Sequence, residues 1–128
     1  MIWNKIYETG NEQVDNEHKE IFKLVQNVMD ASVGEKKAQI GETIDFLANY
    51  TVNHFRHEEN LMDESSYPDK PVHKKQHDDF VQEVLALRAR SADVNDSEIK
   101  KVIVNWLTDH VLGSDKIMAD YYRRFAGK

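Results

Sequence analysis

The sequence predicts an all-α protein: an up-down-up-down antiparallel four-helix bundle with an N-terminal arm and a short C-terminal helix. Five Gly and two Pro among 128 residues are too few for the turns of a many-stranded β fold, while 40% hydrophobic residues suffice for a core. Apolar residues also recur at helical spacing in four segments. Short connections between them favour antiparallel neighbours. The length fits one domain over residues 1–128.

Each predicted helix is read from a stripe of side chains at alternating spacings of four and three residues. The first stripe comprises Val14, His18, Ile21, Val25, Val28 and Ser32, and stops at Gly34. The second comprises Ile40, Ile44, Leu47, Thr51, His54, Glu58 and Leu61, and ends in the turn residues 65–68. The third comprises His73, His77, Phe80, Val84 and Leu87, and the fourth comprises Ile99, Ile103, Trp106 and His110.

The two ends of the chain complete the predicted fold. Residues 116–128 hold five large apolar side chains, which we expect in a short packing helix: Ile117, Met118, Tyr121, Tyr122 and Phe125. Residues 1–12 form an arm, and its side chains Trp3, Ile6 and Tyr7 need a surface to lie on. We therefore expect the arm to pack against the bundle.

Composition excludes several classes of function. Without cysteine there is no disulfide and no thiolate site, so any metal is held by nitrogen and oxygen. A net charge of −6 disfavours a nucleic-acid partner, which requires clustered positive charge. The sequence has neither a secretory signal pattern nor an apolar run long enough for a membrane span. We therefore expect a cytoplasmic monomer.

Histidines occupy positions in these stripes that an ordinary core would fill with leucine or valine. A single buried histidine is usually a neutral, hydrogen-bonded core residue. Here five histidines and a glutamate share the inward faces: His18, His54, His73, His77, His110 and Glu58. Burying so many titratable groups costs several kcal/mol each unless they are paired or bind a metal.

The positions of these residues along the helices place them at one level. The second helix ends just after its His–Glu pair, and the third begins with its two histidines, so the connecting loop brings both pairs together. His18 is near the start of the first helix and His110 near the end of the fourth, which the same topology places at the same end. The pattern predicts a metal centre there, although its ligands suit iron, copper, nickel or zinc.

Residues 54–62, HFRHEENLM, contain polar side chains on two sides of the second helix. His54 and Glu58 follow the inward stripe, whereas His57 and Glu59 fall away from it. We expect His57 to be solvated at the rim of the centre, with contact to a ligand from outside as the alternative.

These residues together resemble the hemerythrin family, and within it the single-domain bacterial form. The similarity begins with Trp3 and Asp15-x-x-His18, and continues through His54-Phe55-x-x-Glu58-Glu59-x-Leu61-Met62, Tyr67-Pro68 and His73-Lys74-x-x-His77-x-x-Phe80. It closes with Trp106-Leu107-x-x-His110-x-x-x-x-Asp115. The resemblance covers nearly the whole chain, and its combined spacings are highly specific. The chain departs from the family pattern at Glu17, at residues 65–66 and at Val111.

The resemblance implies a non-haem di-iron centre. Carried over residue by residue, one iron takes His73, His77 and His110, the other takes His18 and His54, and Glu58 and Asp115 bridge them. With an oxo or hydroxo bridge, the first iron is six-coordinate and the second keeps an open position. The family's implied function is reversible O2 binding at that position as a hydroperoxide. This is carriage, storage or delivery, and not enzyme catalysis.

An apolar pocket for O2 is expected beside the open position. Its candidate residues are Ile21, Phe55, Trp106, Leu107 and Val111. A dry pocket lacks acids that would protonate the bound ligand and release it as peroxide. The same residues would also serve as ordinary core.

Asp115 is the ligand that regular helix geometry places worst. Five steps of an α-helix rotate by about 500°, which leaves Asp115 roughly 140° away from His110. We therefore predict a widened i,i+5 turn or a helix break around residues 112–114.

Other functions remain open at this stage. A di-iron oxidase or peroxidase is disfavoured because such bundles use more carboxylates and Glu-x-x-His motifs. A sensor of O2, nitric oxide or iron would need an output module, for which no residues are left over. A single structural zinc is disfavoured because seven ligands exceed one tetrahedral site, which leaves a pair of zinc ions as the open alternative. For an O2 carrier, the recipient would be an O2-consuming enzyme.

Overall fold

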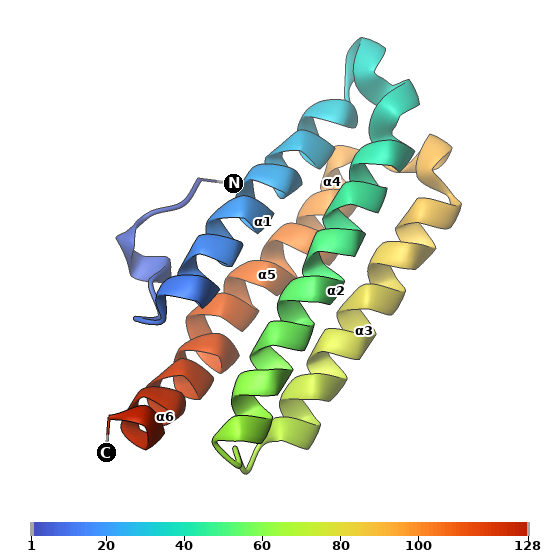
Figure 1. Cartoon of the computed structure of the whole chain (residues 1–128). Helices are drawn as coiled ribbons and strands as arrows, with labels where there is room; N and C mark the ends of the chain where they lie inside the picture. Colours follow the sequence, from blue (N-terminus) through green and yellow to red (C-terminus); the bar gives the residue numbers. More distant parts are fainter. Residues whose placement is uncertain (1, 128) are drawn as a thin grey trace.

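The computed structural model describes residues 2–127, and within this range it contains helices and their connections but no strand. Three long helices are α1 (Glu12–Ala31), α2 (Ile40–Glu64) and α3 (Lys70–Ala89). The fourth segment joins α4 (Asp96–Ile99), η4 (Lys100–Val104), α5 (Asn105–His110), η5 (Val111–Asp115) and α6 (Lys116–Ala126). Figure 1 shows the four segments side by side with alternating direction. The predicted four-helix bundle is confirmed.

Short turns and helix caps separate these segments. The Asn11 side chain accepts a hydrogen bond from the Val14 amide at the start of α1, and Asn95 accepts one from the Glu98 amide at the start of α4. The 3₁₀ turn η1 (Lys5–Tyr7) lies in the N-terminal arm, η2 (Gly34–Gln39) connects α1 to α2, and η3 (Ser91–Asp93) connects α3 to α4. Between α2 and α3, Ser66 adopts a positive φ of 54°, which tightens the turn. This tight turn sets the ends of α2 and α3 close together.

The last segment contains the widened turn that Asp115 required. Residues Val111–Asp115 form a π-helical turn, which confirms the predicted i,i+5 geometry. The backbone stays helical on both sides of it, so α6 continues the fourth helix. The predicted short C-terminal helix is confirmed over Lys116–Ala126, and it follows the fourth helix directly because a π turn admits an extra residue without breaking the helix.

Two apolar clusters lie on either side of the polar centre. The larger one fills the bundle from the middle of α1 to the η2 end, and includes Val25, Ile44, Phe80, Val84 and Ile103. The smaller one lies toward the α2–α3 turn and comprises Met62, Tyr67 and Met118. The polar layer between them is consequently enclosed at both ends by apolar packing.

The N-terminal arm packs against α1 as predicted. The rings of Trp3 and Tyr7 lie 5.3 and 4.8 Å from that of Phe22. One Asp15 oxygen accepts hydrogen bonds from the amide and hydroxyl of Thr9, each 2.8 Å long. Ile6 was wrongly predicted to lie on the bundle, because its side chain is exposed.

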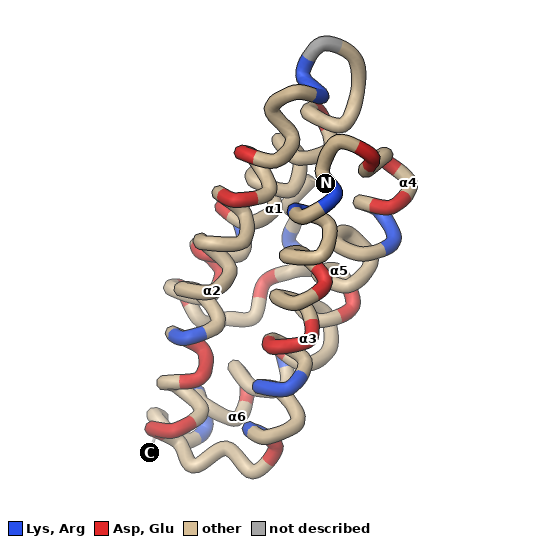
Figure 2. The backbone as a smooth tube through the Cα atoms, turned by 90° about the vertical axis from the view of Figure 1, so that its right-hand side faces the viewer, with Lys and Arg blue, Asp and Glu red and all other residues tan. Residues whose placement is uncertain are grey.

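Charged side chains cover the outside of the bundle. Figure 2 shows basic and acidic residues interspersed along α2 and α3. Lys74 and Lys75 each pair with an aspartate one turn later, Asp78 and Asp79, at 2.9 and 2.8 Å. Among residues 2–127, no helix combines the length and apolar character needed to cross a bilayer.

Candidate metal centre

Seven polar side chains converge inside the bundle from all four helical segments. They are His18 of α1, His54 and Glu58 of α2, His73 and His77 of α3, His110 of α5 and Asp115 of η5, and all are buried. The structure thus brings together every residue predicted as a metal ligand. The distances between their nitrogen and oxygen atoms show how many ions these side chains could hold.

Glu58 presents one carboxylate oxygen to each side of this cluster. Its Oε1 atom lies 3.0 Å from Nε2 of His77 and 3.4 Å from Nε2 of His73. Its Oε2 atom lies 3.0 Å from Nε2 of His54 and 3.4 Å from Nε2 of His18. The carboxylate therefore spans two groups of imidazoles.

Asp115 spans the same two groups. Its Oδ1 atom lies 3.0 Å from Nε2 of His110 and 3.1 Å from Nε2 of His73. Its Oδ2 atom lies 3.0 Å from Nε2 of His18. The π turn makes this contact geometrically accessible, since it brings residue 115 back to the face of residue 110.

The donor atoms accordingly form two overlapping sets, each with its atoms within 4.8 Å of one another. The three-histidine group comprises His73, His77, His110, Glu58 and Asp115, and the two-histidine group comprises His18, His54, Glu58 and Asp115. This division matches the assignment implied by the family resemblance. It follows here from interatomic distances alone.

The orphaned polar atoms test whether cations fit these two groups. Both oxygens of Glu58, Oδ2 of Asp115 and Nε2 of His18 and His54 are buried without a hydrogen-bond partner among the described residues. These nitrogen and oxygen atoms lie close together but are not aligned as hydrogen bonds. This arrangement is expected when their lone pairs point at a common position that a cation would occupy. Nitrogen and carboxylate donors without sulfur suit iron, and their number exceeds one tetrahedral zinc site. The residues present fit two metal ions.

Both bridging carboxyl groups are held in their charged form. Burial raises the pKa of Glu58, but the charge of His54 and the close approach of neighbouring imidazoles, led by His18, outweigh it and hold the pKa well below its usual range. Burial and the charge of Glu58 likewise raise the pKa of Asp115, yet His110 and His18 hold it well below its usual range. Each carboxylate is thus available as an anionic ligand.

Two of the imidazoles are strongly basic in the metal-free protein. Burial lowers the pKa of His54, but the charge of Glu58, the hydrogen bond to Glu17 and the close approach of Glu58 outweigh it and raise the pKa to about 10. Burial also lowers the pKa of His73, while Asp115 and Glu58 raise it to about 9. A bound cation must displace these protons, since a ligand histidine is neutral.

The metal-free protein is expected to lose stability as the solution becomes alkaline. Protonated His54 and His73 stabilise the fold fully below their unfolded pKa of 6.5, and this contribution is lost as pH rises through about 10 and about 9. Between these limits each group lowers the free energy of unfolding by about 1.4 kcal/mol per pH unit. Urea unfolding at pH 7 and pH 9 measures the fall. Metal-loaded protein is the control and should fall less; equal falls would contradict the interpretation.

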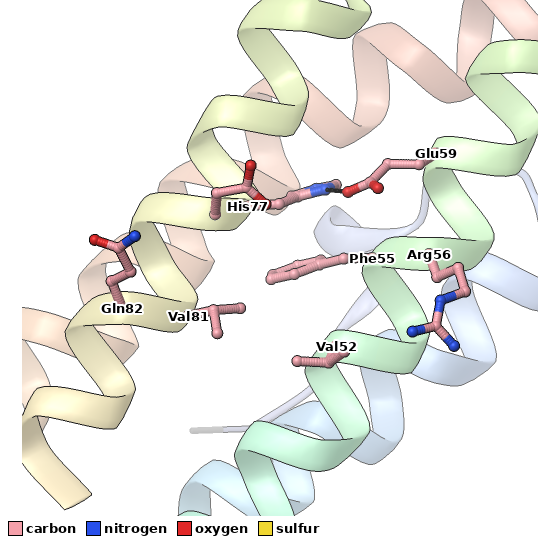
Figure 3. Close-up of a pocket in the computed structure, with 8 residues that line it drawn as sticks. Val52, Phe55, Arg56, Glu59, His77, Val81 and Gln82 are labelled. Carbon is pink, nitrogen blue, oxygen red and sulfur yellow. Dashed lines mark hydrogen bonds and ion pairs between the residues drawn. The ribbon is translucent and has the colours of Figure 1, made fainter. Parts of the chain in front are cut away.

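Two further carboxylates contact the ligand histidines from outside the cluster. Glu17 accepts from Nδ1 of His54 at 2.8 Å, and Glu59 accepts from Nδ1 of His77 at 3.0 Å. Figure 3 shows the Glu59–His77 contact between α2 and α3. Burial raises the pKa of Glu17, yet hydrogen bonds from His54 and His57 produce a net lowering. The helical stripes missed both carboxylates. Their signals in the sequence were positions directly beside ligands and, for Glu59, its place in the motif that carries the family resemblance.

His57 lies at the rim of the centre. Its side chain is 44% exposed, and its Nδ1 atom lies 2.5 Å from Glu17 Oε2. It contacts Glu17 and no member of the ligand cluster, so it lies at the rim as predicted and reaches the ligands only through Glu17.

The predicted O2-pocket residues fall into two groups, buried aliphatic side chains and aromatic rings that stack on ligand histidines. Ile21, Leu107 and Val111 are buried aliphatic side chains. Phe55 stacks on His77 with ring centroids 3.9 Å apart, and Trp106 stacks on His110 at 4.4 Å. Phe55 also lines a pocket of about 390 Å³ between α2 and α3, seen in Figure 3. The two aromatic rings thus support ligands of the three-histidine group.

Comparisons with known proteins identify one family. The model of the hemerythrin HHE cation binding domain matches residues 9–122. Bacteriohemerythrin of Pseudomonas aeruginosa (strain LESB58) is 35% identical over 126 residues, which cover 96% of this chain and 82% of that protein. Myohemerythrin of Theromyzon tessulatum is 34% identical over 113 residues, covering 88% of this chain and 86% of that protein.

Solved structures agree with the sequence comparisons. A crystal structure of wild-type hemerythrin superimposes with a TM-score of 0.86 at 31% identity, covering 95% of this chain and 97% of that chain. The matched region contains both histidine groups and both shared carboxylates. The chain belongs to the hemerythrin family.

Proposed function

We propose that this protein holds two iron ions and binds O2 reversibly, as a carrier, store or delivery protein. The observation that carries the proposal is the pair of buried donor groups that share both carboxylates. The hemerythrin family membership supports iron as the metal and O2 as the ligand. When bound, two ferrous ions supply the two electrons that O2 accepts.

The unequal donor sets indicate where the external ligand binds. The three-histidine group offers five protein donors, whereas the two-histidine group offers four. Both carboxylates are shared, so the difference is one imidazole. The two-histidine group therefore has room for a small ligand, and we assign O2 to this side.

The surrounding side chains favour binding over oxidation. Ile21, Leu107 and Val111 are buried and carry no acidic hydrogen, so they exclude water and proton donors. Five histidines to two carboxylates also differ from the carboxylate-rich sites of bundle oxidases. In this proposal the protein is a cytoplasmic monomer that transforms no substrate and passes O2 to a consuming enzyme.

Visible absorption of the iron-loaded, reduced protein tests the proposal. The spectrum is recorded under argon, then in air, then under argon again. We expect a charge-transfer band that appears in air and disappears when O2 is removed. A band that never forms, or that bleaches irreversibly to the ferric state, would favour an oxidase or a sensor.

A polar side chain in the proposed pocket is expected to shorten the lifetime of the O2-binding form. Leu107→Gln brings an amide and its water close to the centre, and should speed conversion to the ferric state about tenfold, equivalent to about 1.4 kcal/mol in the barrier. Repeated air and argon cycles measure this rate. Leu85→Gln is the matched control because Leu85 is exposed on α3. Equal rates in the two variants would argue against Leu107 as a pocket residue.

A further inference from the structure

We infer that Glu17 is a positioning residue for the two-histidine group, and that His57 in turn positions Glu17. The inference rests on the metal centre proposed above. It adds two side chains from outside the ligand set: Glu17 lies on α1 one residue before His18, and His57 lies on α2 three residues after His54.

The first step is the orientation of His54. Its Nδ1 atom lies 2.8 Å from Oε1 of Glu17, while its Nε2 atom lies 3.0 Å from Oε2 of Glu58 inside the centre. A carboxylate only accepts hydrogen bonds, so Nδ1 must carry the hydrogen in this contact. The Nε2 lone pair of the neutral ring is then free for a cation. Glu17 thereby selects both the tautomer and the direction of the ring.

The second step is the orientation of Glu17 itself. Its other oxygen, Oε2, lies 2.5 Å from Nδ1 of His57. The two carboxylate oxygens are therefore engaged by two rings of α2, and the Glu17 side chain is only 14% exposed. A carboxylate held at both oxygens has little rotational freedom, which is what a positioning contact requires.

The two metal groups differ in this outer support. In the three-histidine group, Glu59 contacts a ligand ring, His77, at 3.0 Å. In the two-histidine group, Nδ1 of His18 has no hydrogen-bond partner among the described residues. In the two-histidine group, which has fewer protein donors, the carboxylate that contacts a ligand histidine from outside is therefore Glu17, through His54. Removal of Glu17 should therefore weaken metal binding by the two-histidine group.

Retention of Co²⁺ tests the inference without any O2 reaction. Wild-type protein loaded with Co²⁺ is challenged with excess chelator, and the loss of cobalt absorption is followed in time. His54→Ala identifies the phase that belongs to the two-histidine group. Glu17→Ala should accelerate that phase about 10–100-fold, the usual effect of removing a partner of a ligand histidine. Glu17→Gln keeps an acceptor oxygen and should restore much of the retention, and His57→Ala should fall between wild type and Glu17→Ala.

Glu59→Ala is the matched control, since it removes the corresponding carboxylate behind His77 and should accelerate the other phase. Wild-type rates in Glu17→Ala, or acceleration of the same phase by both alanine variants, would overturn the inference. Equal effects of Glu17→Gln and Glu17→Ala would also overturn it, because a mere packing role predicts no rescue by the amide. If wild-type protein fails to hold two Co²⁺ ions, the proposed metal centre fails instead.

Discussion

Removal of both metal ions is expected to lower the free energy of unfolding by about 8 kcal/mol. A ligand that binds only the folded state at 1,000 times its dissociation constant contributes about 4.1 kcal/mol, and this chain offers two such groups. The physical origin is the buried cluster, in which both oxygens of Glu58 and Oδ2 of Asp115 lack hydrogen-bond partners without a cation. For a domain of this length, the difference corresponds to a shift in Tm of about 20 °C or more.

Thermal unfolding of iron-loaded and chelator-stripped protein measures this shift at one pH and one protein concentration. Variant Glu58→Ala serves as the control, since added metal should barely change its Tm. A shift of only a few degrees in the wild type would show that the centre contributes little to the fold. The bundle would then owe its stability to its two apolar clusters.

Glu58→Ala is expected to lose both ions, whereas His57→Ala keeps both. Glu58 offers one oxygen to each group, at 3.0 Å from His77 on one side and from His54 on the other. Its removal therefore takes a ligand from both ions and leaves the surrounding imidazoles to repel one another when protonated. His57 belongs to neither donor group, and its contribution passes through Glu17 to the rate of metal loss.

Metal analysis after gel filtration measures the stoichiometry of each variant. His54→Ala completes the series, because it should lose the ion of the two-histidine group and keep the other. His54 and His57 lie on the same helix three residues apart, so the comparison separates ligation from proximity. Equal metal loss in the two histidine variants would contradict the assignment of His57 to the rim.

Much of the site could be predicted from the sequence because its ligands obey helix periodicity. His54 and Glu58 are four residues apart, as are His73 and His77, and such pairs point the same way from any regular helix. Short connections between the helices then favour antiparallel neighbours. This topology places the ligand-bearing ends of the four helices at the same end of the bundle. Once the family resemblance implied that Asp115 is a ligand, the irregular turn before it was also predictable, since regular geometry would have left that carboxylate on the wrong side.

Glu17 and Glu59 could not be predicted in the same way. Each is one residue away from a ligand, and a step of one residue turns a side chain by about 100° around the helix, toward the boundary with a neighbour. Whether it reaches a ring there depends on how the two helices are rotated and spaced. The same uncertainty applies to the stacking of Phe55 and Trp106 on His77 and His110.

The sequence by itself determined the four helices, the inward positions of the five histidines and Glu58, and the end of the bundle where they meet, while Asp115 came from the family resemblance. Only the tertiary structure decided which oxygen of Glu58 and Asp115 faces which histidine group, that α6 continues the fourth helix, and that Glu17 lies between His54 and His57. The reason is physical: periodicity within one helix fixes the direction of a side chain relative to its own axis. Contacts across helices also require the rotation and separation of the partner, which are set by the packing of the whole core.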